Sequence, residues 1–378
     1  MQIYVFYIQY FKPKSLNFNP INVYFCCSYI FEMIFADILI NWYSTHKRDL
    51  PWRNTKNPYL IWLSEIILQQ TQIKQGQPYY EAFVSKFPTV NALANAKEPE
   101  VLKLWQGLGY YSRARNLHFS AKYISNELHN KFPKTHKELI ALKGVGDYTA
   151  SAIASICYNE PAAVVDGNVY RVLSRYFNIC TPINSTKGFK EFKTLAQQLL
   201  PKTNIGDYNQ AIMEFGALQC KPANPSCNEC PLQNGCKAHA FDKINRLPVK
   251  LKKVKVSKKY FNFLVFLSND GKTILEQRTE KGIWQNLYQF PLIESKNSLT
   301  KNGLISHLKV KPLLNGNTYE LSLYNDKDIV HKLSHQHLHT KFWIIETHTL
   351  PKESTPIAEI RQYAVPVLIE NFIEQFNF

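Results

Sequence analysis

Four cysteines crowd into 17 positions of this 378-residue chain, with the spacing Cys220-x6-Cys227-x2-Cys230-x5-Cys236. Four thiolates from one short loop can surround a [4Fe–4S] cluster or a tetrahedral zinc ion, because both take soft sulfur ligands. Zinc ribbons usually pair two Cys-x2-Cys knuckles, and this loop has one, so the spacing favours the cluster over zinc or uncoordinated thiols. We expect a structural cluster, because Lys221, Pro222 and Pro225 make the first spacer a stiff, basic loop suited to a phosphate.

The other four cysteines, Cys26, Cys27, Cys157 and Cys180, are scattered through apolar surroundings. A secreted disulfide framework would be shorter and more evenly cross-linked, so the sequence predicts a reducing compartment with one local metal site. We expect the protein in the cytoplasm, associated with the nucleoid.

The formal charge is +16, from 45 Lys and Arg against 29 Asp and Glu. Such an excess indicates a polyanionic partner, either nucleic acid or an anionic membrane surface. No stretch reaches the ~18 uninterrupted apolar residues of a membrane span, which favours nucleic acid.

The first 32 residues are aromatic-rich and lack both the apolar core and the cleavage site of a signal peptide. An amphipathic pattern begins at Met33, with Ile34, Phe35, Ile38, Leu39 and Trp42 on one face. We therefore expect the natural start at Met33, and residues 1–32 to be a non-native or disordered extension.

Helical periodicity runs from Met33 to about Leu218. Asn57 is the expected N-cap before Pro58, followed by an apolar stripe. Further helices are predicted at about 99–106, 112–129, 136–142, 148–158, 168–177, 189–200 and 207–219.

Beyond the cysteines, the lysine-rich stretch "PVKLKKVKVSKK" marks an exposed linker. The runs "YFNFLVFL", "KTILEQ" and "KFWIIET" are β-rich, and the end of the chain is helical with Pro366 restarting the helix. The fold class is therefore multi-domain: an all-α region followed by a separate α+β domain.

Two further motifs carry possible chemistry. The glycines of "LKGVGDYTA" let backbone N–H groups converge on a phosphate, although many helical hairpins turn on glycine. Glu65 lies beside an apolar helix stripe, and Asp166 lies where Asn168 can cap the next helix. Taken alone, Glu65 is typical of the polar edge of a helix and Asp166 of a turn residue. Cleavage of a glycosidic bond, however, needs one protonated acid and one anion.

Together these signals resemble the iron–sulfur helix-hairpin-helix DNA glycosylases, specifically the MutY-type adenine DNA glycosylases. The resemblance spans roughly residues 34–372 through "LPWR", "WLSEIILQQTQ", "LWQGLGYYSRARNLH", "GVGDYTA", "VDGNVYRVLSR", "CPLQNGC" and "IWQNLYQFP".

The resemblance implies a catalytic region at 33–240, with a six-helix barrel at about 60–168 and the helix-hairpin-helix near 136–158. The cluster subdomain would combine 33–58 with 169–240. A basic linker at 241–258 and a Nudix-like 8-oxoguanine-recognition domain at 259–378 would follow.

The resemblance also implies roles for individual residues. Glu65 would protonate adenine N7, Asp166 would stabilise or attack C1′, and Tyr148 and Asn168 would position the sugar and Asp166. The implied DNA and 8-oxoguanine contacts are Arg53, Gln69, Gln70, Thr71, Leu108, Tyr110, Gly144, Val145, Gly146, Ser334 and His335, and the implied cluster ligands are Cys220, Cys227, Cys230 and Cys236.

The chain departs from its relatives at three places. Tyr148 stands where bifunctional relatives carry a Schiff-base lysine, so we expect little or no strand cleavage. Lys143 replaces a common proline, which should change the stiffness of the turn more than phosphate affinity. The C-terminal domain lacks the glutamate-rich Nudix box, so pyrophosphatase activity is not expected.

The leading prediction is a monomeric, monofunctional base excision repair enzyme that removes adenine mispaired with 8-oxoguanine or guanine in duplex DNA. Two alternatives stay open: a glycosylase for thymine or oxidised pyrimidines, and a non-catalytic DNA-binding or redox-sensing cluster protein. We assign the charge to the hairpin at Gly144 to Gly146, the loop closed by Cys220 and Cys227, Arg113 and Arg115, and the linker lysines.

Overall fold

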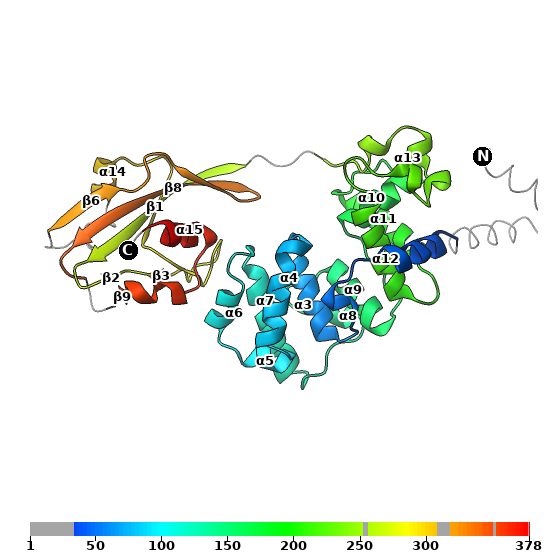
Figure 1. The fold of residues 1–378 in the computed structure, drawn as a ribbon, viewed down its shortest axis with the longest axis horizontal. Coiled ribbons are helices and arrows are strands. Elements are labelled where there is room, and N and C mark those ends of the chain that lie inside the picture. Colours follow the sequence, from blue (N-terminus) through cyan, green and yellow to red (C-terminus); the bar gives the residue numbers. More distant parts are fainter. Residues whose placement is uncertain (1–33, 252–255, 308–317, 351–352, 377) are drawn as a thin grey trace, which may run out of the picture. The chain divides into compact units, whose positions relative to one another are not determined.

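The computed structural model describes residues 34–251, 256–307, 318–350, 353–376 and 378. The expectation for residues 1–32 lies outside these ranges. The described residues divide into two compact units, one from segments 1–50 and 150–251 and one from segments 51–149 and 252–378 (Figure 1). Each unit therefore combines segments that are distant in the sequence.

The first unit is helical. Its elements are helix 34–46, the part of α9 (Asp147–Tyr158) from Ala150 on, α10 (Gly167–Phe177), α11 (Thr186–Gln198), α12 (Ile205–Leu218), η2 (Cys227–Glu229), η3 (Gln233–Gly235), α13 (Lys237–Ala240) and η4 (Ile244–Arg246). Phe35 and Leu39 are buried in the first helix as predicted, but Ile34 is 44% exposed because it lies at the helix start. Cys180 is also exposed, contrary to the apolar surroundings we predicted.

A close helix contact in this unit fixes the start of α10. A Cβ on Gly216 of α12 would lie 2.7 Å from the Cβ of Asn168 and 2.9 Å from its carbonyl oxygen. Only glycine permits this approach, which places α12 directly against the first turn of α10.

The second unit begins with η1 (Pro51–Arg53), α3 (Pro58–Leu68), α4 (Ile73–Lys86), α5 (Val90–Asn95), α6 (Glu98–Leu104), α7 (Ser112–Asn126) and α8 (His136–Leu139). Asn57 caps α3 as predicted, because its side chain accepts a hydrogen bond from the Tyr59 amide at 3.0 Å. The stripe of α3, Tyr59, Trp62, Leu63, Ile66 and Ile67, is buried as predicted. Helices α4 and α5 were not predicted from the sequence.

The same unit contains a mixed sheet in the order β5-β1-β8-β6, with β7 also paired to β8. The strands are β1 (Ser257–Ser268), β2 (Lys272–Thr273), β3 (Glu276–Gln277), β4 (Tyr288–Gln289), β5 (Leu292–Ser295), β6 (Tyr319–Leu323), β7 (Ile329–Lys332), β8 (Gln336–Thr347) and β9 (Thr355–Pro356), with the helices α14 (Lys301–Ile305), η6 (Ile357–Gln362) and α15 (Val367–Gln375). Pro366 precedes α15, as predicted.

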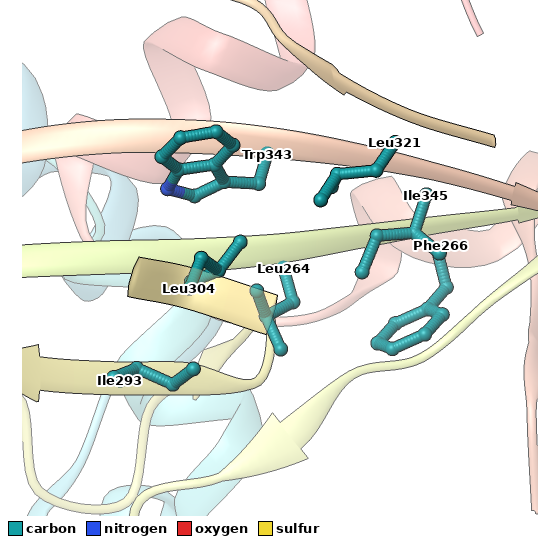
Figure 2. Packing of buried hydrophobic residues seen from close by; sticks show 7 residues of the cluster. All are labelled: Leu264, Phe266, Ile293, Leu304, Leu321, Trp343 and Ile345. Atoms are coloured by element: carbon teal, nitrogen blue, oxygen red, sulfur yellow. The ribbon is translucent and has the colours of Figure 1, made fainter. Parts of the chain in front are cut away.

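Strands β1 and β8 are parallel and paired along their whole length, from Ser257 with Gln336 to Ser268 with Thr347. On one face of the sheet, Leu264, Phe266, Trp343 and Ile345 pack with Leu304 of α14 (Figure 2). On the other face, Phe342 stacks on Phe372 of α15 with ring centroids 4.1 Å apart. Because the pairing starts at Ser257, the last two lysines of the lysine-rich stretch, Lys258 and Lys259, lie in β1.

Substitution of Gly216 by alanine should lower stability by about 1–3 kcal/mol, because the added methyl must displace Asn168. Gly303→Ala is the matched control, since the nearest atom to its new Cβ lies at 3.4 Å. Thermal unfolding of both variants measures the difference. A Gly216→Ala melting temperature equal to that of the wild type would mean that the contact between α10 and α12 adapts freely.

Candidate active site and DNA-contacting elements

The turn that ends α3 and the loop that precedes α7 are joined by one side chain, Arg113 of α7. Its Nη1 donates to the carbonyls of Ile66, Ile67 and Gln69 at 3.0, 2.9 and 2.6 Å, and to Thr71 Oγ1 at 3.3 Å. Its Nη2 donates to the carbonyls of Leu108 and Gly109 at 3.2 and 3.1 Å.

This geometry corrects our assignment of Arg113 to the charge that faces DNA. Arg113 is only 8% exposed, and both of its Nη groups donate to backbone carbonyls. Burial lowers its pKa to about 10, so it stays charged at neutral pH. Arg115 donates to the carbonyl of Gln285 at 2.8 Å. Both arginines therefore make hydrogen bonds within the protein.

The residues predicted to contact DNA differ in exposure. Tyr110 is 49% exposed and Gln70 is also exposed, whereas Leu108 is 6% exposed. Tyr110 is thus accessible for the predicted contact with DNA, whereas Leu108 is buried although Gly107 and Gly109 flank it. The Gln69 side chain donates to Thr149 Oγ1 at 3.2 Å, which turns its amide toward α9.

The hairpin turn between α8 and α9 carries Gly144, Val145 and Gly146. Gly144 has φ +84° and lies so close to Asn116 that a Cβ there would clash at 2.7 Å, whereas the space around the Cα of Gly146 is open. Val145 is buried and anchors the turn. The backbone carbonyl of Lys143 accepts a hydrogen bond from Ser120 Oγ at 2.9 Å. The Lys143 ammonium lies 4.5 Å from the Phe119 ring centroid. The turn thus presents an exposed Gly146 backbone.

Asp166 is the N-cap of α10, which corrects our prediction that Asn168 caps this helix. Its Oδ1 accepts from the amides of Asn168 and Val169 at 2.9 and 2.8 Å. Asn168 instead donates its side-chain amide to Asp166 Oδ2 at 2.7 Å. The extended backbone at Asp166 allows this cap, because its carboxylate reaches two free N–H groups.

Arg171 continues this network toward the cysteine loop. Its Nη2 donates to Asn168 Oδ1 at 2.9 Å, and its Nε donates to the carbonyl of Cys220 at 2.7 Å. The carboxylate of Asp166 is thus linked through Asn168 and Arg171 to the first cysteine of the loop.

Burial raises the pKa of Asp166, and the hydrogen bonds from Val169 and Asn168 oppose this effect without cancelling it. The carboxyl group is therefore less easily ionised than one in water. Once ionised, it is an anion held by helix N–H groups in poorly solvated surroundings, where it attracts a nearby positive charge strongly.

The four cysteines of the loop lie within electrostatic reach of one another. Burial, reinforced by the charges of Cys220, Cys236 and Cys227, raises the pKa of Cys230 to about 12. Backbone N–H groups face the Cys230 and Cys236 sulfurs, and Arg175 donates to Cys220 Sγ at 3.4 Å.

An all-sulfur donor set with N–H groups directed at it fits a thiolate-bound iron–sulfur cluster. Among the residues that the structure describes, no three His, Cys, Asp or Glu side chains converge closely enough to hold a metal ion.

Ser334 and His335 are exposed immediately before β8. Ser334 Oγ lies 2.5 Å from the hydroxyl of Tyr110, and the carbonyl of His335 accepts from the Ser257 amide at 3.1 Å. The structure therefore brings together two residues that were predicted to contact 8-oxoguanine from distant parts of the chain.

Arg53 ends η1, Glu65 lies in α3, and Tyr148 lies in the first turn of α9. These residues belong to the second unit, whereas Asp166, Asn168 and the cysteine loop belong to the first. The meeting of Glu65 with Asp166 in one site stays a prediction.

Comparison with known proteins gives two family matches. Residues 63–200 match the HhH-GPD superfamily of base excision DNA repair proteins, and residues 262–375 match the NUDIX domain. The adenine DNA glycosylase of Buchnera aphidicola subsp. Schizaphis graminum is 36% identical over 311 residues, which cover 81% of this chain and 86% of that protein. The chain belongs to the adenine DNA glycosylase family.

The human adenine DNA glycosylase is 44% identical over 244 residues, which cover 60% of this chain and 45% of the human protein. The solved structure of a thermostable thymine-DNA glycosylase superposes with a TM-score of 0.52 at 29% identity, over 56% of this chain and 97% of that one. The predictions of a helix-hairpin-helix core and a Nudix-like C-terminal domain are confirmed.

This adenine DNA glycosylase is thus an enzyme of base excision repair that hydrolyses N-glycosyl bonds. No helix in the described ranges is long and apolar enough to cross a membrane. The roles of Arg171 and Arg175 were not predicted, because no sequence pattern indicates which backbone carbonyls a buried guanidinium will contact.

Proposed function

We propose that this enzyme removes adenine paired with 8-oxoguanine or guanine in duplex DNA. The observation that carries the proposal is the buried Asp166 carboxylate, held by Asn168 and the first turn of α10. An anion fixed in this way can offset the positive charge that develops on the sugar as the base departs.

Glu65 supplies the proton in this proposal. An adenine stacked in a duplex is out of reach of a side chain, so the nucleotide must first flip out, and exposed Gln70 or Tyr110 fills the space that it leaves. Protonation of adenine N7 by Glu65 makes the base a neutral leaving group. Asp166 then stabilises C1′ electrostatically or covalently until water completes an abasic site.

Tyr148 replaces the amine that strand cleavage would require. A neutral phenol forms no Schiff base with the opened sugar, so we expect a monofunctional glycosylase that releases adenine and leaves the strand intact. Tyr148 and Asn168 position the sugar and Asp166 in this reaction.

The pair of Tyr110 and Ser334 supports recognition of 8-oxoguanine on the opposite strand. A tyrosine in a loop of the helical region and a serine before β8 share one hydrogen bond at an exposed position. His335, the hairpin at Gly144 to Gly146, and Arg53 would add contacts to the same duplex.

We also propose that Cys220, Cys227, Cys230 and Cys236 hold one [4Fe–4S] cluster. When bound, the cluster supplies a rigid cross-link for a loop that has little regular secondary structure of its own. The enzyme would work as a monomer in the cytoplasm.

Glu65→Gln and Asp166→Asn should each lower the single-turnover rate of adenine excision by about 10²–10⁴-fold, because each removes one charge-handling group. The assay uses duplexes with A opposite 8-oxoguanine, A opposite G, T opposite G, or thymine glycol. Abasic product from the pyrimidine duplexes would support the alternative glycosylase, and no product from any duplex would support the non-catalytic alternative. A wild-type rate in Glu65→Gln would reject Glu65 as the acid.

The raised pKa of Asp166 predicts a pH dependence. As the pH falls through that pKa, the carboxylate becomes neutral, so excision should decline at a higher pH than the ~4 of a solvated carboxyl. Ionised Asp166 is buried at a cost, so Asp166→Asn, which can still cap α10, should melt no lower than the wild type at pH 7. Any excess of the Asp166→Asn melting temperature over that of the wild type should shrink as the pH falls, because the wild-type carboxyl then becomes neutral. A melting temperature clearly below the wild type at pH 7 would contradict this account.

Cys230→Ser should abolish the cluster, with iron and acid-labile sulfide per chain falling from the [4Fe–4S] ratio toward zero. The matched control is Cys180→Ser, because Cys180 is exposed and lies outside the loop. Metal analysis of the anaerobically purified proteins gives the answer. One zinc per chain, in place of iron and sulfide, would overturn the assignment.

Tyr110→Phe and Ser334→Ala should both reduce the preference for 8-oxoguanine over guanine by about 5- to 30-fold, since either change removes their shared hydrogen bond at ~1–2 kcal/mol. Because both act on one bond, the double variant should be little worse than either single variant. Tyr123→Phe is the control, as Tyr123 is an exposed tyrosine of α7. Fully multiplicative effects would show that the two residues read the base independently.

A further inference from the structure

We propose that Arg113 is a positioning residue for base flipping, which holds the turn at Gln69 to Thr71 and the loop at Leu108 to Tyr110 in one arrangement. The proposal rests on the proposed function of these two segments as the parts that enter the duplex.

The strongest observation concerns backbone conformation. Gln70 has φ 57° and Tyr110 has φ 48°, so both adopt the left-handed conformation that side chains other than glycine, asparagine and aspartate rarely take. The carbonyls of Gln69 and Gly109, each directly before one of these residues, both accept from Arg113. One guanidinium thus fixes the peptide group that precedes each strained residue.

The acceptors of Arg113 indicate that it organises loops and does not neutralise charge. In the described part of the chain, its hydrogen-bond partners are five carbonyls and one hydroxyl, with no carboxylate among them. Three of these carbonyls lie at the C-terminal end of α3, the helix that carries Glu65, where a cation is favoured by the helix dipole. Arg113 therefore also caps the helix of the proposed acid.

Aromatic contacts complete the arrangement. The guanidinium carbon lies 5.0 Å from the ring centroid of Trp105, which is fully buried, and 5.7 Å from that of Tyr110. A planar, forked cation can span two loops and lie over a ring at once, whereas lysine offers a single point of donation. Backbone strain that is held in this way at a ligand-contacting position is typical of preorganised sites.

The test compares Arg113→Lys with Arg115→Lys. Both keep the charge on α7, and Arg115 donates outside the two segments, to Gln285. Amide hydrogen exchange without DNA should rise about tenfold at residues 69–71 and 108–110 in Arg113→Lys, with little change in the cores of α5 and α10. Arg115→Lys should leave exchange in both segments unchanged.

Single-turnover adenine excision and 2-aminopurine fluorescence then report on function. Arg113→Lys should slow both flipping and excision by about 10- to 100-fold, because Gln70 and Tyr110 are then misplaced. Gln70→Ala or Tyr110→Ala should lower the excision rate less in the Arg113→Lys background than in the wild type. The reason is that Arg113→Lys has already lost the arrangement of the two segments.

Unchanged exchange in either segment, or an equal rise throughout the second unit, would overturn the proposal. Wild-type flipping in Arg113→Lys would also overturn it, whatever the exchange. The exchange result needs no glycosylase activity. An enzyme without adenine excision, but with the expected exchange pattern, would therefore refute the proposed function and leave the positioning role in place.

Discussion

Hydrogen bonds from buried arginines to backbone carbonyls hold together the irregular segments of this molecule. Arg113, Arg171 and Arg175 are each less than 9% exposed. The turn after α3, the start of α10 and the cysteine loop lack partners in regular secondary structure for many of their carbonyls. A carbonyl left without a donor in a buried place is costly, and a guanidinium can serve several at once. Removal of one arginine therefore affects a whole segment.

The two carboxylates proposed to act in catalysis differ in their structural roles. Asp166 is part of the architecture, since it caps α10 and is linked to the cysteine loop through Asn168 and Arg171. Glu65 lies in the middle of a helix whose C-terminal end is capped by a side chain from α7. The position of Asp166 thus depends on the loop that would hold the cluster, and the position of Glu65 depends on the two segments proposed to contact DNA.

The sequence predicted those features that depend on local patterns. Apolar spacing and the Asn57 cap identified α3 and most later helices. Sequence motifs sufficed for the family, which the similar proteins confirm. Long-range partners were less predictable. "SRARN" looked like a basic surface, yet Arg113 turns inward because five carbonyls lie within its reach. Leu108 lies between two glycines and is nevertheless buried. Asp166, and not Asn168, caps α10 because its carboxylate reaches two backbone amides.

The start of β1 has a consequence for how the two halves of the polypeptide are connected. The Ser257 amide binds the carbonyl of His335, so the sheet begins at the residue proposed to sense the damaged base. Ser257 donates twice to this carbonyl, through its amide at 3.1 Å and through its hydroxyl at 3.3 Å, so the first residue of β1 holds the backbone of His335 in place. The residue at which the sheet begins and the residue proposed to read the opposite base therefore share one backbone position, so a substitution at Ser257 acts on His335 although the two are 78 positions apart in the sequence.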